Sequence, residues 1–149
     1  MLTWATDSYK VNKIITVSRL ISGRFRCGSL VKHFYPLVTT GICELCGTEV
    51  EDVPHIILPK CSALKVRAES LLTFSKNTLA TKPTASAIFH EILNSEDDIL
   101  KVQFFIDPTV LPRVILENQK DKSIFDSILS VTTTWCYSLT RYRNKLLGK

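Results

Sequence analysis

Four potential metal ligands, Cys43, Cys46, His55 and Cys61, lie in one short segment with the spacing C-x2-C-x8-H-x5-C. Three thiols and one imidazole suit a tetrahedral Zn2+ ion, and four protein ligands leave no open position for a substrate. The pattern therefore predicts a structural zinc site. The alternative is that the cysteines are ordinary buried residues, since free cysteines are common in protein cores.

The residues around these ligands fit the first part of such a site. Gly47 directly follows Cys46 and can adopt the positive φ that a tight turn between two ligands often needs. Asp52 is a good N-cap and Pro54 is tolerated in a first helical turn, so a short helix is predicted around His55. The sequence thus predicts a knuckle followed by a short helix.

The second part of the site needs a break in this helix. On one continuous helix His55 and Cys61 would lie on nearly opposite faces, because six residues rotate by about 240° around the axis. Pro59 disfavours helical geometry at Leu58 and interrupts the hydrogen-bond ladder. We therefore expect the chain to turn at Pro59 and to bring Cys61 back to the ion.

The composition is typical of a globular protein. Of the 149 residues, 45% are hydrophobic and 22% are charged. No apolar run approaches the length of a membrane span, and the first residues lack the apolar core of a secretory signal. We expect an intracellular protein, nuclear or cytoplasmic, without membrane contact. The odd number of five cysteines agrees with a reducing compartment, and Cys27 and Cys136 are predicted to be core thiols.

The net charge of +5 is unevenly distributed. Residues 1–35 contain six basic and one acidic side chain, residues 36–120 contain eight basic and eleven acidic, and residues 121–149 contain five basic and two acidic. Two basic ends around an acidic middle suggest contact with a polyanion such as RNA or DNA. The alternative is that each basic stretch is simply a solvated helix face.

Four basic residues are the candidate phosphate contacts: Lys13, Arg24, Arg26 and Lys32. They lie among aromatic residues, and a mixture of cations and aromatic rings is what phosphate and base contacts need. The alternative is that these aromatic rings pack against the zinc module.

Apolar residues recur at helical spacing along most of the chain. Besides the short helix around His55, helices are predicted over residues 8–22, 29–35, 62–77, 84–93 and 124–146, while residues 99–106 are compatible with a helix or a short strand. Residues 77–86 are the best linker candidate.

This predicts a mainly α fold, with a small irregular Cys-Cys-His-Cys zinc knuckle embedded in a helical domain that ends in a long C-terminal helix. Residues 1–79 would hold the basic helical segment, the knuckle and the following helix. Residues 84–149 would form a C-terminal helical region that packs on the first part as one unit.

The segment 43–64 combines CELCG, acidic residues, HIIL and CSAL. It resembles the zinc-binding segment that follows the polymerase domain in reverse transcriptases of non-long-terminal-repeat retrotransposons. LISGRFR at 20–26 is similar to the segment that precedes that motif, and FIDP, PRVI and WCYSL further on resemble the closing segments of such open reading frames in invertebrates. One departure is the gap of five residues between His55 and Cys61, where the family usually has four.

The resemblance implies that the parent protein is an RNA-directed DNA polymerase and that this segment helps to grip template RNA or target DNA. Polymerase catalysis needs carboxylates that hold divalent metal on a hairpin turn. The only adjacent pair, Asp97 and Asp98, lies in an acidic break without such a hairpin. We expect no catalytic activity and no small-molecule substrate for this chain alone.

Two other interpretations remain open. The chain could be a stand-alone helical zinc module whose C-terminal helix docks a protein partner. It could also be part of an enzyme, which requires a polymerase domain upstream.

Overall fold

The computed structural model describes residues 8–23, 25–37, 39–108 and 122–148. Apart from one antiparallel bridge between Ile42 and Val50, the regular structure in these ranges is helical. The elements are α2 (Ser8–Ile21), α3 (Gly28–Phe34), α4 (Val53–Ile57), the 3-10 turn η1 (Ser62–Leu64), α5 (Lys65–Leu79), α6 (Pro83–Leu93), α7 (Asp98–Ile106) and α9 (Lys122–Leu146). The predicted mainly α fold with a long C-terminal helix is confirmed.

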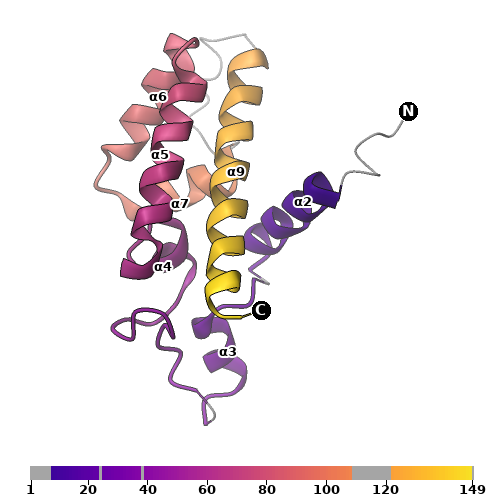
Figure 1. Cartoon of the computed structure of the whole chain (residues 1–149), viewed down its shortest axis with the longest axis vertical. Coiled ribbons are helices and arrows are strands. Elements are labelled where there is room, and N and C mark those ends of the chain that lie inside the picture. The colour runs from indigo at the N-terminus through magenta and orange to yellow at the C-terminus, as the bar shows by residue number, and fades with distance from the viewer. Residues whose placement is uncertain (1–7, 24, 38, 109–121, 149) are drawn as a thin grey trace.

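Helix α9 is the central element of the fold. It contacts α2, α4, α5, α6 and α7, and Figure 1 shows α5 running beside it while α2 crosses it at an angle. Its apolar residues at helical spacing, Ile128, Val131, Trp135 and Leu139, are all at most 5% exposed. Most of the apolar face of α9 is therefore covered by other helices of the same chain.

The apolar run 99–106, which was compatible with a helix or a short strand, forms helix α7. The Asp97 carboxylate accepts hydrogen bonds from the backbone N–H groups of Ile99 and Leu100, at 3.1 and 3.2 Å, which caps the helix at its N-terminus. Phe104 and Phe105 are both fully buried. Phe105 stacks on Trp135 of α9 with ring centroids 4.7 Å apart, so an aromatic cluster joins α7 to the central helix.

Trp135 also connects α9 to the segment that carries the candidate ligands. Its indole N–H donates a buried hydrogen bond of 2.9 Å to the carbonyl oxygen of Ile57 in α4. We expect Trp135→Phe to lower the free energy of unfolding by about 2–4 kcal/mol, because the carbonyl loses its donor and the smaller ring leaves a cavity. Urea unfolding measures this, with Phe74→Leu at an exposed aromatic position as the control. Equal stabilities for the two variants would contradict the role of the indole.

Two expectations about the helices need correction. The linker is shorter than residues 77–86, because α5 extends to Leu79 and α6 already starts at Pro83. Helix α2 is present and ends at Ile21, and Gly23 shortly after it has the positive φ of +71° that a helix end favours. Its apolar stripe is only partly buried, however: Leu20 is 4% exposed, but Ile14 and Ile21 are 57% and 56% exposed.

Candidate metal centre

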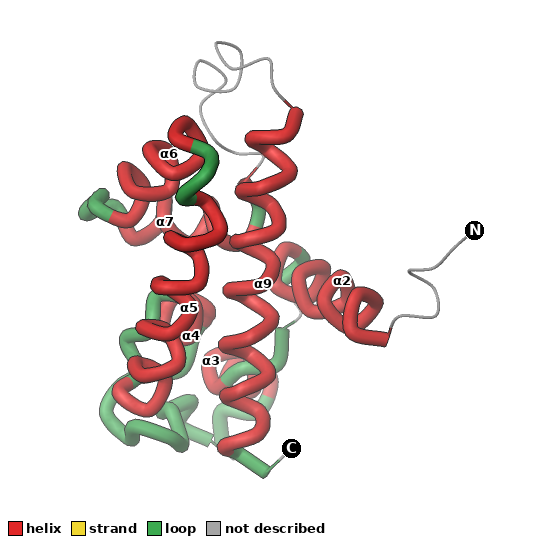
Figure 2. Tube along the Cα trace, turned by 45° about the horizontal axis from the view of Figure 1, so that its top comes forward, coloured by secondary structure: helices red, strands yellow, loops and turns green. Residues whose placement is uncertain are grey.

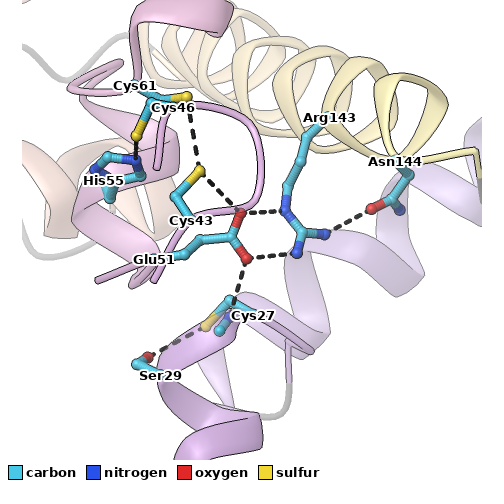
Figure 3. A network of polar contacts seen from close by, with 10 residues as sticks. Cys27, Ser29, Cys43, Cys46, Glu51, His55, Cys61, Arg143 and Asn144 are labelled. Carbon is cyan, nitrogen blue, oxygen red and sulfur yellow. Dashed lines mark hydrogen bonds and ion pairs between the residues drawn. The ribbon is translucent and has the colours of Figure 1, made fainter. Parts of the chain in front are cut away.

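The four predicted ligands come together in the structure. The ligand atoms of Cys43, Cys46, His55 and Cys61 all lie within 4.8 Å of one another. The Cys43 and Cys61 sulfur atoms are 3.8 Å apart, and the Cys46 sulfur is 3.5 Å from Nε2 of His55 (Figure 3). Three of the four residues are buried and Cys46 is half-buried. These residues can hold one metal ion.

Backbone hydrogen bonds shape the knuckle that carries the first two cysteines. The N–H of Gly47 donates to the carbonyl of Cys43 at 2.8 Å, and the N–H of Cys43 donates to the carbonyl of Glu49 at 2.8 Å. Gly47 has a φ of +68°, as the sequence predicted, which lets the chain turn tightly. The bridge between Ile42 and Val50 closes the base of the turn.

Helix α4 presents the histidine. The Asp52 side chain accepts a hydrogen bond from the backbone N–H of His55 at 2.8 Å, and Pro54 lies in the first turn, so the predicted cap and start are confirmed. Nδ1 of His55 is buried without a hydrogen bond and lies 3.4 Å from a carboxylate oxygen of Glu49. Nε2 is therefore the nitrogen that faces the cysteines.

The five-residue gap between His55 and Cys61 is accommodated by a turn. Helix α4 ends at Ile57, the N–H of Leu58 still donates to the carbonyl of Pro54 at 2.9 Å, and the N–H of Lys60 donates to the carbonyl of His55 at 3.2 Å. Pro59 thus separates α4 from η1, and Cys61 returns to the cluster.

The thiols of Cys43 and Cys46 differ in their pKa values. Burial raises the pKa of the Cys43 thiol to about 11. Hydrogen bonds from the Thr48 side chain and backbone lower the pKa of the Cys46 thiol to about 6, and the Thr48 hydroxyl lies 3.4 Å from the sulfur. A cation that binds at neutral pH would therefore meet Cys46 mainly as thiolate and would displace a proton from Cys43.

Glu51 forms a buried ionic link from the knuckle to the end of α9. Its carboxylate accepts two hydrogen bonds from the Arg143 guanidinium, at 2.8 and 2.5 Å, and a third from the backbone N–H of Gly28 at 2.9 Å (Figure 3). The Cys43 sulfur lies 3.8 Å from the same carboxylate. Glu51 and Arg143 are 4% and 5% exposed, and the Arg143 guanidinium also lies over the Phe25 ring.

The ionisation of Glu51 depends on this pairing. Burial acts to raise the pKa of the carboxyl group, but the hydrogen bonds and the charge of Arg143, with the N–H of Gly28, outweigh it and hold the pKa below its usual value. The sequence did not predict this pair. No local pattern links two residues 92 positions apart.

The two remaining cysteines lie outside the cluster, as predicted. Cys27 is 4% exposed, with its sulfur 3.4 Å from the Ser29 hydroxyl. Cys136 is fully buried, its thiol donates to the carbonyl of Phe105 at 3.1 Å, and burial strongly raises its pKa.

The candidate phosphate contacts are spread over the basic segment. Lys13 on α2 is half-buried, its ammonium group donates to the Thr134 hydroxyl on α9 at 2.7 Å, and burial lowers its pKa. Arg26 and Lys32 are exposed. Arg24 lies outside the described residues. Lys13 thus has a structural contact within the protein, whereas Arg26 and Lys32 are accessible to a ligand.

Comparisons with known proteins assign no family. No protein-family model, no curated protein and no solved structure matches the chain at a significant level. Among the helices in the described ranges, none combines the length and the apolar character needed to cross a bilayer.

Proposed function

We propose that this chain is a zinc-stabilised nucleic-acid-binding module without catalytic activity of its own, from the C-terminal region of a non-long-terminal-repeat retrotransposon reverse transcriptase. The observation that carries the proposal is the cluster formed by Cys43, Cys46, His55 and Cys61. The resemblance of residues 20–26 and 43–64 to such proteins supplies the parent class.

Two separations within the cluster support the choice of zinc. With metal–sulfur bonds of about 2.3 Å and metal–nitrogen bonds of about 2.0–2.1 Å, a tetrahedral zinc ion places two sulfur atoms about 3.8 Å apart and a sulfur and a nitrogen about 3.6 Å apart. The corresponding separations here are 3.8 Å for Cys43 and Cys61 and 3.5 Å for Cys46 and His55. The carboxylate of Glu49 near Nδ1 of His55 is the kind of outer partner that orients a metal-bound imidazole.

Zinc in this site would act as a structural cross-link. The four residues would hold it between the knuckle, α4 and the start of η1, with every coordination position filled by protein. Glu51 would extend the cross-link to α9 through Arg143 and to α3 through Gly28. The metal would thereby fix the surface on which the exposed cations lie.

Binding to a nucleic acid would be driven by the basic ends of the chain. We expect the zinc-loaded protein to bind RNA or single-stranded DNA, with the logarithm of the binding constant falling linearly with the logarithm of salt concentration and a slope of about −0.7 for each phosphate contacted on a single strand. Filter-binding titrations with an unstructured RNA and a DNA strand at several salt concentrations measure the slope. The absence of binding at low salt, or a binding affinity that does not change with salt, would contradict an electrostatic mechanism of binding.

A further inference from the structure

A basic groove lies between α2 and α9 and extends to α5. We define it by four cationic side chains: Arg19 on α2, Arg67 on α5, and Arg141 and Lys145 on α9. The groove has a volume of about 1000 Å³, and no carboxylate lies among the residues that line it. All four cations are exposed.

Among the described residues, no acidic side chain pairs with the cations of the basic groove. In the part of the chain that the structure describes, the ion pairs join His55 to Glu49, Lys60 to Asp98 and Arg143 to Glu51, and none includes a cation of the groove. Four like charges that share one recess repel one another, which a polyanion would relieve.

Aromatic rings hold two of these cations in place. The Arg67 guanidinium lies 5.4 Å from the centre of the Tyr142 ring, and the Arg141 guanidinium lies 5.9 Å from the centre of the Tyr137 ring. Arg141 also donates a hydrogen bond of 3.4 Å to the Tyr137 hydroxyl. Arginines fixed on aromatic faces lose less side-chain entropy when they bind a phosphate, and planar guanidinium and tyrosine groups can stack on unpaired bases.

Polar residues of α2 line this groove together with one apolar residue, Ile15. Asn12, Thr16 and Arg19 lie along it, whereas Ile14 and Ile21 are exposed. The groove is a largely polar, positively charged recess between α2 and α9, and such a recess suits the flexible backbone and exposed bases of a single strand.

We propose that the basic groove is the site that binds single-stranded nucleic acid, with phosphates on Arg19, Arg67, Arg141 and Lys145 and a base near Tyr142. This inference rests on the proposed function but moves the interface from Arg26 and Lys32 to the groove between α2 and α9. Its ligand class is a single strand of RNA or DNA, bound without base-pair recognition.

Fluorescence anisotropy with a labelled 12-nucleotide uridine RNA, the equivalent thymidine DNA and a 12-base-pair duplex tests the groove. Since each single-strand phosphate contact contributes a salt slope of about −0.7, Arg19→Gln and Arg141→Gln should each weaken binding about fivefold at 0.1 M salt and reduce the slope by about 0.7. Tyr142→Leu should weaken binding several-fold without changing the slope, since stacking involves no counterion release.

Two control variants separate the groove from other basic surfaces. The single variant Lys76→Gln, an exposed lysine on the same helix as Arg67, should bind like the unmodified protein. The double variant Arg26→Gln/Lys32→Gln removes the two exposed candidate phosphate contacts outside the groove and should weaken binding less than Arg19→Gln or Arg141→Gln. Circular dichroism and metal content confirm that each variant is folded. If Arg26→Gln/Lys32→Gln reduced binding and the groove variants bound normally, the groove would not be the binding site, whereas the proposed function would still hold. Tighter binding to the duplex than to the single strands would also overturn the groove as a single-strand site. No binding of any of the three nucleic acids by the unmodified protein would overturn both the groove and the proposed function.

Discussion

Loss of the metal is expected to unfold the segment that contains the knuckle and α4. Native mass spectrometry should show one zinc ion per chain, and Cys46→Ser should lose the ion together with part of the helical circular-dichroism signal. Apparent zinc-binding free energies of about 10–16 kcal/mol are as large as the total stability of many domains. Metal binding is therefore expected to add a large contribution to that of the buried Ile56 and Ile57 in this part of the fold. Chelation by EDTA should have the same effect as the substitution.

The two cysteines outside the cluster provide matched controls. Cys27→Ser removes a buried thiol close to the site, and Cys136→Ser removes one in the helical core. Both variants should retain one zinc ion, even where they lower the melting temperature. A protein that holds no metal and keeps its melting temperature in EDTA would contradict the structural zinc site.

The second large effect is expected at the buried ion pair. Glu51→Gln keeps the shape of the side chain but leaves the Arg143 charge buried without a counter-charge, and removing one partner of such a pair costs about 3–5 kcal/mol. We therefore expect a reduction of this size in the free energy of unfolding, measured with urea at constant zinc. The double variant Glu51→Gln/Arg143→Met should lose less than the sum of the two single variants, because no unpaired charge remains.

An exposed ion pair in the same protein serves as the comparison. Lys60 and Asp98 approach to 2.8 Å, but both side chains are almost half exposed. Asp98→Asn should therefore change the stability far less than Glu51→Gln. Equal effects at the two pairs would show that burial does not determine the contribution of Glu51.

The effect of Glu51→Gln should depend on pH. The folded pKa of Glu51 lies below its unfolded value of about 4.3, so its contribution is complete above about pH 4.3 and is lost as the pH falls through the lower folded pKa. The difference in stability between Glu51→Gln and the unmodified protein should therefore be constant near neutral pH and should shrink in acid. If the difference in the free energy of unfolding grew in acid, this would contradict a folded pKa of Glu51 below its unfolded value.

The local parts of the site were predictable from the sequence because each depends on a residue with a strong backbone preference. Gly47 adopts positive φ, Asp52 caps α4, and Pro59 ends it before Cys61. These signals act over a few residues, so one sequence is enough to detect them. The cluster of Cys43, Cys46, His55 and Cys61 was predictable for the same reason, because its four ligands lie in one short segment of the sequence.

The parts that could not be predicted depend on packing between distant segments. The run 99–106 has no clear period, and its helix is stabilised by the Asp97 cap and by the burial of Phe104 and Phe105. Helix α2 was predictable from apolar residues at helical spacing, but the way it lies against α9, which it crosses at an angle (Figure 2), was not. Ile14 and Ile21 of this helix are exposed.

The contact between Glu51 and Arg143 has a consequence for the order of folding. A zinc ion with three thiolates carries one net negative charge, and the Glu51 carboxylate next to Cys43 adds a second. Arg143, 92 residues further along the chain, restores a single charge. While the chain is being synthesised, the knuckle would hold two uncompensated negative charges until the end of α9 arrives. Docking of α9 would then complete the metal site electrostatically, so a helix made long after the knuckle would stabilise it.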